Sequence, residues 1–442
     1  MARSNTLILI MFFFLTALFV LFTSSSFAQA NNQSEKLQLV VDNFFELYNS
    51  GDTAAYRKFL EPTVENEAQL NQVLTGFNNA YRVIGKVDVK RVQLNSRDNV
   101  EVWARDKRYD AWWKFTIYTD SLQKFKRRTI QPVPFESYFL QSGKLPVNQL
   151  RDSIHHYIES KLGQEFSGNV FIAKGNELIY ANSFGNNQNN QPNNFNQQFD
   201  LASMGKVFTA ISILQLRDNG KLSLNDQVSE FVPEIKNKAV ANLTIQQLLT
   251  HTSGMGDFFE SPLYEKLKGS LQNPIDFMPF FENDHLSFSP GKDWQYSNTG
   301  YSLLALIIER TSGTSFKNYI EQNIFQKAFM KNTNVGGGAG GGYSTVNDLH
   351  KFSLALLRNG LLEASTTKEL LRYTVNGKYG YGTEHQLLAG ENIIGHSGGF
   401  INVCTELNIY TKSDYIVIIL SNSNPPFGHF LSNKIKELLV RK

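Results

Sequence analysis

The sequence has 442 residues, of which 41% are hydrophobic, 13% aromatic and 19% charged. This length and composition predict two or three domains with ample hydrophobic cores, and they exclude a disordered, collagen-like or repetitive fibrous protein. The 43 Lys and Arg nearly balance the 40 Asp and Glu, so the formal charge of +3 gives no electrostatic argument for nucleic-acid binding. The single cysteine, Cys404, excludes an intramolecular disulfide framework and a cysteine-based zinc cluster.

The start of the chain is typical of a secretory signal peptide over residues 1–30. Arg3 precedes an apolar run from Leu7 to Phe22, and small residues follow, so cleavage is expected after Ala28 or Ala30. The alternative is an uncleaved membrane anchor, although the apolar run is shorter than the roughly 20 residues that span a bilayer. No cysteine there can carry a lipid. We therefore expect a periplasmic or secreted protein with no membrane span after cleavage.

Residues 31–140 predict a small α+β domain in which helices precede strands. Apolar residues recur at helical spacing in its first half and alternate in its second half. The expected helices are 37–47, 53–60 and 66–79, and the expected strands are 82–94, 100–108, 110–118 and 124–130. This order resembles the cone-shaped domains of the nuclear transport factor 2-like (NTF2-like) class, which bind small ligands or act as spacers. We expect three aromatic side chains in the core and four basic ones on a solvated strand face: Trp103, Trp112 and Trp113, and Lys124, Lys126, Arg127 and Arg128.

After a linker that contains prolines, a larger domain is expected over residues 147–442. Its sequence predicts a helix (147–161), a β-hairpin (166–173 and 177–183), a solvated loop rich in Asn and Gln (186–198) and a helical middle. Two strands, 401–410 and 414–421, and a closing helix end the chain. Strands at both ends of a helical middle predict an α/β fold, in which one sheet is flanked by helices and carries a helical insert.

Two serines compete as the nucleophile, and the first is Ser203. It forms a Ser-x-x-Lys motif with Lys206, and an amphipathic helix from Val207 to Leu216 follows. The partial positive charge of a helix start favours negative charge on the serine oxygen, and a neutral amine one turn away can accept its proton. The motif alone is weak, because Ser121 and Lys124 also match it and a helix-capping serine is a simpler explanation.

Ser397 is the second candidate, in the Gly-x-Ser-x-Gly pattern of residues 395–399. In an α/β-hydrolase an acid and a histidine follow the nucleophile, and Asp414 and His429 occur in that order. That fold needs a helix after the serine, whereas residues 400–410 alternate like a strand. The pattern therefore favours Ser203.

Neither a cofactor nor a metal is expected. The glycine-rich segment 336–342 lacks the Lys and Ser or Thr of a phosphate-binding loop, which leaves a mobile or tightly packed turn. The 8 histidines include no His-Glu-x-x-His, and the adjacent His155 and His156 point to different faces of the predicted helix.

Later motifs strengthen the case for Ser203. Tyr296-Ser297-Asn298 gives Tyr-x-Asn downstream of it, whereas the similar Tyr180-Ala181-Asn182 lies upstream, and His396-Ser397-Gly398 follows further along. Five more segments occur in order: 199–203, 222–226, 248–254, 307–310 and 343–345. Together they make residues 166–422 resemble the serine β-lactamase and penicillin-binding-protein superfamily. The most similar branch holds class C β-lactamases, D-aminopeptidases, D-Ala-D-Ala carboxypeptidases and related esterases.

The resemblance implies a role for each site residue. Ser203 would be the acylated nucleophile, and Lys206 and Tyr296 would share its proton. Tyr296 would then activate the water that hydrolyses the acyl-enzyme, and Asn298 would orient Lys206 and the substrate. The backbone N–H groups of Ser203 and Gly399 would form the oxyanion hole. A structural role is expected for His251.

The third motif, His396-Ser397-Gly398, departs from the pattern of many β-lactamases. They have Lys-Thr-Gly, whose Lys anchors a substrate carboxylate, but here His396 takes that place, and a histidine is mostly neutral near pH 7. We therefore expect little β-lactam turnover and measurable cleavage of an ester or a D-amino-acid amide. The expected partner is a small-molecule or peptide substrate with an acyl group. The alternative is an exported sensor that captures a ligand covalently without turnover.

Overall fold

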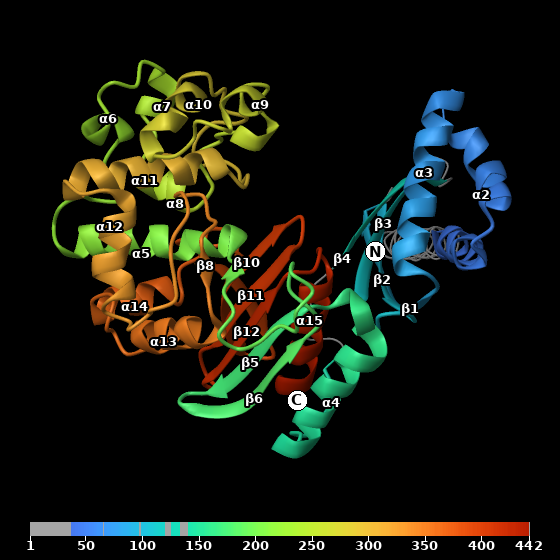
Figure 1. Ribbon diagram of the computed structural model, residues 1–442. Coiled ribbons are helices and arrows are strands. Elements are labelled where there is room, and N and C mark those ends of the chain that lie inside the picture. Colours follow the sequence, from blue (N-terminus) through green and yellow to red (C-terminus); the bar gives the residue numbers. More distant parts are fainter. Residues whose placement is uncertain (1–36, 65, 97–98, 120–124, 133–139, 442) are drawn as a thin grey trace, which may run out of the picture. The chain divides into compact units, whose positions relative to one another are not determined.

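The structure is a computed structural model, and it describes residues 37–64, 66–96, 99–119, 125–132 and 140–441. The predicted signal segment lies outside the described residues. The chain divides into two compact units, one up to Pro134 and one from Phe135 onward (Figure 1). Within the described ranges, no helix is both long enough and apolar enough to cross a membrane.

Helices open the first unit: residues 37–50, α2 (Thr53–Leu60) and α3 (Glu67–Ile84). Asp52 and Asn66 begin α2 and α3, because their side chains accept hydrogen bonds from backbone N–H groups of the first turn. The prediction that a strand starts at residue 82 is wrong, since α3 continues to Ile84. That residue extends the buried stripe of the helix, and Gly85, with a φ of 68°, ends it.

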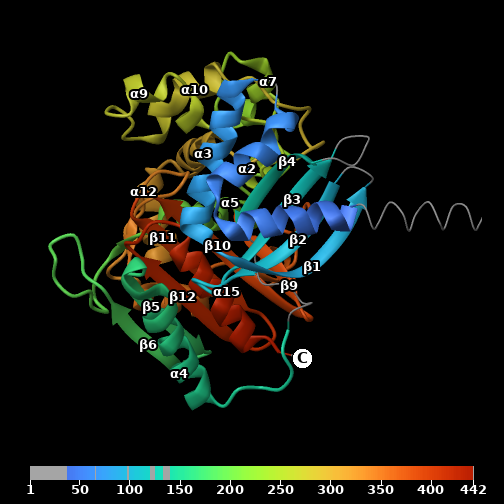
Figure 2. The same ribbon diagram turned by 90° about the vertical axis from the view of Figure 1, so that its right-hand side faces the viewer.

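A four-stranded antiparallel sheet follows in the order β1-β2-β3-β4, and the helices of the unit cover one of its faces (Figure 2). The strands are β1 (Val87–Ser96), β2 (Asn99–Asp106), β3 (Trp112–Thr119) and β4 (Phe125–Pro132). The interior is aromatic: Phe77 stacks on Tyr56 with ring centroids 3.8 Å apart. The core positions predicted for Trp103, Trp112 and Trp113 are confirmed, because all three are buried.

Arg128 does not lie on a solvated strand face, so that prediction is wrong for this residue. Its Nε donates a 3.0 Å hydrogen bond to the hydroxyl of Tyr56, which is fully buried. Adjacent side chains of a strand point to opposite faces, and consecutive basic residues therefore cannot all face solvent. Lys124 and the side chains of Lys126 and Arg127 lie outside the described part of the chain.

The second unit is built around a six-stranded antiparallel sheet in the order β6-β5-β12-β11-β10-β9. The strands are β5 (Gly168–Lys174), β6 (Glu177–Phe184), β9 (Glu384–Leu388), β10 (Glu391–Phe400), β11 (Val403–Tyr410) and β12 (Tyr415–Ser421). Helices α4 (Val147–Tyr157) and α15 (Phe427–Leu439) cover one face, and α5 (Lys206–Asp218) and α13 (Val346–Leu357) lie on the other (Figure 1). The predicted α/β fold, with one sheet made from both ends of the domain, is confirmed.

The third motif lies within β10, and a turn that was not predicted separates this strand from β11. The chain turns at Ile401 and Asn402, where Asn402 has a φ of 57°. The strand predicted over residues 401–410 therefore begins at Val403. The loop rich in Asn and Gln, residues 186–198, is mostly exposed, as predicted.

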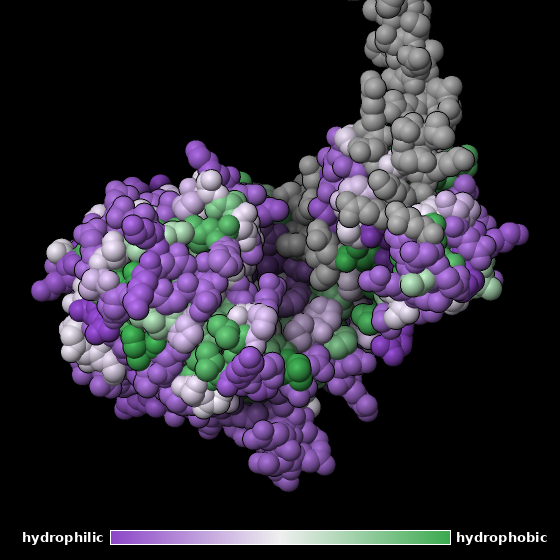
Figure 3. All heavy atoms as spheres, turned by 90° about the horizontal axis from the view of Figure 1, so that it is seen from above, coloured by the Kyte–Doolittle hydropathy of each residue, from purple (hydrophilic) through white to green (hydrophobic). Residues whose placement is uncertain are grey.

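The helical insert is closed by two short strands, β7 (Phe199–Asp200) and β8 (Tyr343–Ser344), which pair with each other. Besides α5, it contains α6 (Val228–Phe231), α7 (Lys238–Ala241), α8 (Ile245–Leu249), α9 (Tyr264–Leu267), α10 (Met278–Glu282), α11 (Asn298–Ser312) and α12 (Phe316–Ile320). The helix α14 (Ala364–Leu370) follows α13. The long helices α5 and α11 pack on each other and are buried over most of their length. The surface seen from above in Figure 3 is mostly hydrophilic, with smaller hydrophobic patches.

Candidate active site

Ser203 lies at the junction between the sheet and α5. It sits in the single helical turn Ala202–Gly205, which leads directly into α5. Asp200 fixes this turn, because its Oδ1 accepts a 2.7 Å hydrogen bond from the Ala202 N–H. The turn packs against β10, so the nucleophile predicted near one end of the domain meets the third motif from the other end.

The Lys206 amine is buried and held by three oxygen atoms. Its Nζ lies 3.3 Å from Ser203 Oγ and 2.6 Å from Asn298 Oδ1, and it also bonds the Ala339 carbonyl oxygen. Burial lowers the pKa of Lys206 to about 7, although the charges of Asp257 and Glu384 act to raise it.

These contacts suit the Lys206 amine to accept a proton. A neutral amine has two N–H groups and one lone pair, and the Asn298 and Ala339 oxygens can only accept hydrogen bonds. The lone pair is therefore left for the Ser203 hydroxyl. With a pKa of about 7, much of Lys206 is in this neutral form near neutral pH.

Asn298 connects Lys206 to a carboxylate that the sequence analysis missed. It is the first residue of α11, and the Ser297 side chain caps this helix by accepting from the Gly300 N–H at 3.0 Å. The Asn298 Nδ2 donates a 2.6 Å hydrogen bond to Asp257 Oδ2. No motif spacing linked Asp257 to the site, because the contact depends only on how the insert folds.

The Tyr296 hydroxyl is buried near Ser203. Burial raises the pKa of Tyr296 well above its usual value, and the Ser203 hydroxyl lowers it only in part. No described residue makes a hydrogen bond of good geometry with this hydroxyl, and Lys206 Nζ lies 4.7 Å from the ring centroid. A phenol with a raised pKa stays protonated at neutral pH, so Tyr296 is suited to donate a proton.

The glycine-rich segment 336–342 is a tightly packed turn whose contribution to the site was not predicted. The Gly341 N–H donates a 2.8 Å hydrogen bond to the Ala202 carbonyl oxygen, and the Ala339 carbonyl accepts from Lys206. A Cβ atom at Gly340 would lie 2.3 Å from the Ala202 carbonyl oxygen. The absence of side chains therefore lets this backbone approach the nucleophile turn closely.

His396 is buried in β10, with its ring centroid 6.4 Å from that of Tyr296. Its Nδ1 donates to the Ser397 carbonyl oxygen at 2.6 Å, and its Nε2 accepts from the Tyr379 hydroxyl at 3.1 Å. Burial lowers the pKa of His396, so the ring is neutral near pH 7. It therefore offers no positive charge to a substrate carboxylate.

Ser397 does not form a nucleophile elbow, and the α/β-hydrolase alternative is wrong. Ser397 lies inside β10, and its Oγ donates a 2.7 Å hydrogen bond to Glu384 Oε1. His429, the base in that alternative, instead pairs with Glu406 at 2.5 Å. A strand runs through the position at which an α/β-hydrolase requires a sharp turn into a helix.

His251 is fully buried and packs against Tyr296 and Tyr301, with ring centroids 4.3 and 4.9 Å away. Its Nδ1 accepts a 3.1 Å hydrogen bond from the Ser297 N–H, and burial lowers the pKa of His251 well below its usual value. A neutral imidazole thus holds the backbone between Tyr296 and Asn298.

A cavity of about 370 Å³ opens beside Ser203. Gly399 and the glycine-rich turn line one part of it, and aromatic side chains line another: Phe258, Phe259, Tyr264, Phe277 and Phe400. The exposed rings of Phe259 and Phe400 lie 6.4 Å apart. Lys268 also borders the cavity, but it pairs with Glu265. We name this cavity the aromatic pocket, and it fits an apolar group attached to a carbonyl at Ser203.

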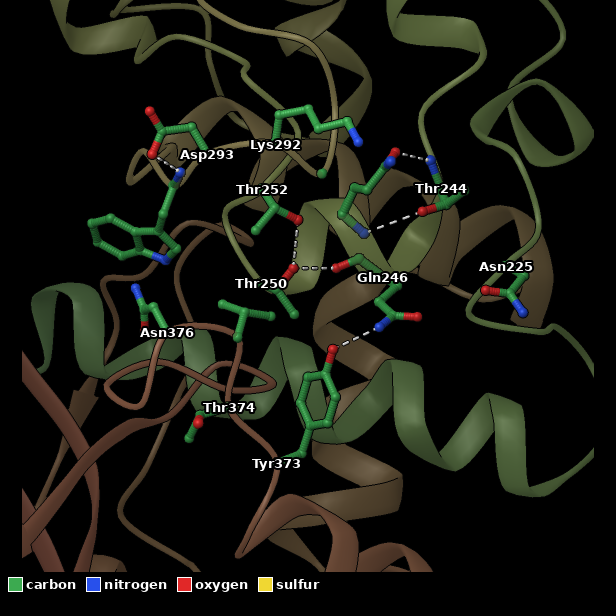
Figure 4. A pocket seen from close by; sticks show the side chains of 14 residues that line it. Asn225, Thr244, Gln246, Thr250, Thr252, Lys292, Asp293, Tyr373, Thr374 and Asn376 are labelled. Atoms are coloured by element: carbon green, nitrogen blue, oxygen red, sulfur yellow. Dashed lines mark hydrogen bonds between the residues drawn. The ribbon is translucent and has the colours of Figure 1, made fainter. Parts of the chain in front are cut away.

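A larger pocket, of about 770 Å³, borders the residues on either side of His251 and contains none of the predicted site residues (Figure 4). Four of its polar side chains bond one another in two pairs. The Gln246 Nε2 donates to the Tyr373 hydroxyl at 2.7 Å, and the Thr250 and Thr252 hydroxyls lie 2.9 Å apart. These groups need no ligand to satisfy them.

A sheet with a helical insert, and a serine beside a buried lysine, are the features of the penicillin-binding-protein class. The model of the β-lactamase family matches residues 156–442, which is well over half of the sequence. The chain belongs to the β-lactamase family.

Individual relatives agree with this assignment. Penicillin-binding protein 4* of Bacillus subtilis is 38% identical over 175 residues, which cover 39% of this chain and 38% of that protein. The putative penicillin-binding protein PbpX of the same organism is 29% identical over 318 residues, or 62% of this chain and 75% of the relative. The chain thus spans less than two thirds of the first relative and about three quarters of the second.

Solved structures show the same fold. A penicillin binding protein from Bacillus halodurans superposes with a TM-score of 0.57 at 28% identity, covering 67% of this chain and all of that one. A D-amino acid amidase from Ochrobactrum anthropi SV3 gives a TM-score of 0.57 at 19% identity, covering 66% and 97% of the two chains.

Proposed function

We propose that this protein is an exported serine hydrolase that cleaves an ester or amide through an acyl-enzyme on Ser203. The observation that carries the proposal is the buried Lys206 amine, whose two N–H groups have acceptor-only partners and whose lone pair is left for Ser203 Oγ. With a pKa of about 7, a substantial fraction of the amine is unprotonated at neutral pH, and the amine still binds a proton strongly enough to take it from the serine.

In the acylation step, Lys206 takes the Ser203 proton while Oγ bonds to the substrate carbonyl carbon. The carbonyl oxygen becomes negatively charged, and the backbone N–H groups of Ser203 and Gly399 stabilise it, each by about 3 kcal/mol. Tyr296 then gives its proton to the leaving group as the bond to that group breaks. Lys206 returns the proton it holds to the Tyr296 oxygen, and the acyl group stays on Ser203.

In the deacylation step, water attacks the acyl carbonyl carbon and its proton passes through Tyr296 to Lys206. The bond to Ser203 Oγ then breaks, the Oγ regains a proton from Lys206, and the carboxylic acid leaves. The resemblance implied Tyr296 as the base for water. Its raised pKa supports a relay role instead, with Lys206 as the final acceptor.

The aromatic pocket supports an apolar acyl group as the part of the substrate that is recognised. The neutral His396 supports weak binding of a substrate carboxylate, and hence slow β-lactam turnover. D-amino-acid amides belong in the substrate screen together with esters, because an amidase for such compounds shares the fold.

A fluorophosphonate probe tests the nucleophile. Intact mass and peptide mapping should find one adduct, on Ser203, and the Ser203→Ala variant should remain unlabelled. No adduct, or an adduct on Ser397, would overturn the proposal. An ester that acylates Ser203 but is never released would support the sensor alternative.

We further propose that residues 1–30 direct export and that the first unit is a spacer of the NTF2-like class. The composition of the leader supports the first point. Helices on one face of a four-stranded sheet, around an interior filled with aromatic rings, support the second. N-terminal sequencing of the exported protein should start after Ala28 or Ala30, and a start at Met1 would contradict cleavage.

A further inference from the structure

Glu384 presents a carboxylate beside the third motif. It is the first residue of β9 and lies opposite Gly395 of β10. Its Oε1 accepts from Ser397 Oγ at 2.7 Å and its Oε2 accepts from the Ser397 N–H at 3.3 Å. These bonds fix the carboxylate in place, and yet 45% of the side chain remains exposed to solvent.

The negative charge of Glu384 has no strong counter-charge. His396 Nδ1 lies 3.7 Å away, but that ring is neutral near pH 7. In the described part of the chain, no Lys or Arg forms an ion pair with Glu384. Its charge acts on Lys206 and Tyr296, since it contributes to raising the pKa of both. An exposed carboxylate therefore lies within electrostatic reach of the nucleophile.

Glu384 and the aromatic pocket lie toward opposite ends of the same stretch of β10. Ser397, which holds Glu384, comes two residues before Gly399, and Phe400 of the pocket comes directly after it. With about 3.3 Å per residue, Ser397 and Phe400 are roughly 10 Å apart. A carbonyl bound at Gly399 would thus have an apolar surface on one side and a carboxylate on the other.

We propose that Glu384 determines specificity by binding a positively charged leaving group, across the scissile bond from an apolar acyl group. The proposal rests on the proposed function, and it defines the substrate class more narrowly. A cation would fill the exposed side of the carboxylate, whereas a leaving group with its own carboxylate would be repelled. This charge preference is the reverse of that of an enzyme in which a lysine anchors the substrate carboxylate.

Three phenylacetyl thioesters test the preference, because they differ mainly in the charge of the thiol released. The thiols are thiocholine (positive), 2-mercaptoethanol (neutral) and mercaptoacetate (negative), and each is measured with a chromogenic disulfide. We expect kcat/KM for the cation to exceed that of the neutral ester by about tenfold, and the anion to fall about tenfold below it. The spread should shrink as salt is added.

Variants assign the preference to one side chain. In Glu384→Gln, which keeps an acceptor for Ser397, the three values should come within about threefold of one another, and in Glu384→Lys the order should reverse. Glu177→Gln is the matched control, because Glu177 is an exposed acid on β6, at the opposite edge of the same sheet, and its removal changes the net charge equally. This control should keep the wild-type order.

The outcomes separate the two proposals. If the neutral thioester is not hydrolysed and Ser203 is not labelled by the fluorophosphonate, the proposed function fails. If all three thioesters are hydrolysed at equal rates, or if the order survives in Glu384→Gln, the proposed function stands and the role of Glu384 is refuted. Each variant is compared only with itself across the three esters, so a change in overall activity does not affect the result.

Discussion

The charge of Asp257 acts to raise the pKa of Lys206, and it should therefore shift the pH range in which activity rises. Two hydrogen bonds of 2.6 Å, joined by the Asn298 amide, separate Asp257 Oδ2 from Lys206 Nζ. The two charges are therefore about 7 Å apart, and with an effective dielectric constant of about 20 their attraction is about 2 kcal/mol. This attraction favours the protonated form of Lys206, so its loss in Asp257→Asn should make Lys206 neutral at lower pH.

The assay is the pH dependence of kcat/KM for a neutral thioester. In the wild type, activity should rise with pH through the pKa of Lys206, about 7. In Asp257→Asn this rise should move down by about one pH unit, because one unit corresponds to about 1.4 kcal/mol and solvent screens part of the attraction. Asp293→Asn removes an equal charge from an exposed residue and should leave the curve in place. A rise that stays in place or moves to higher pH in Asp257→Asn would refute the assignment of Lys206 as the base.

Three further predictions concern packing and stability. Gly340→Ala should abolish labelling of the nucleophile and cost about 2–4 kcal/mol, because its Cβ would meet a backbone oxygen at 2.3 Å. Gly269→Ala, at an exposed turn residue that does not line the aromatic pocket and has nothing within 4 Å, should be silent in the same thermal-melting and labelling assays. Breaking the buried Glu406–His429 pair by Glu406→Gln should cost about 3 kcal/mol in urea unfolding. The loss should be greatest between about pH 4.5 and 6.5. Burial acts to raise the Glu406 pKa, but the hydrogen bond and charge of His429 lower it to about 2, so its contribution declines as pH falls from about 4.5 toward 2. Burial acts to lower the His429 pKa, but its hydrogen bonds to Cys404 and Glu406 raise it, so its contribution declines as pH rises above about 6.5. A constant loss from pH 3 to 9 would contradict this. Phe77→Ala should destabilise the first unit by about 3–5 kcal/mol in the full chain without slowing ester hydrolysis, and slower hydrolysis would show that this unit takes part in catalysis.

Local patterns in the sequence were enough for the fold class and for most elements. Alternating residues predicted β5, β6, β11 and β12, and helical spacing predicted α4 and α5. Errors arose where the end of an element depends on one residue. Helix α3 is longer than predicted and ends only at Gly85, and the turn at Asn402 was not predicted. A helix or strand signal is averaged over many residues, while its end is decided by a single backbone conformation and its packing.

The sequence by itself also indicated Ser203, Lys206, Tyr296 and Asn298, because each belongs to a short motif whose order along the chain can be recognised. The chemical state of these residues was decided only by the tertiary structure. Burial in the helical insert lowers the pKa of Lys206 to about 7, and a glycine-rich turn supplies one of its acceptors. Asp257 and Glu384 enter the site through contacts between segments that no spacing connects. Burial and charge separation depend on distances in space, and a pattern along the chain does not contain them.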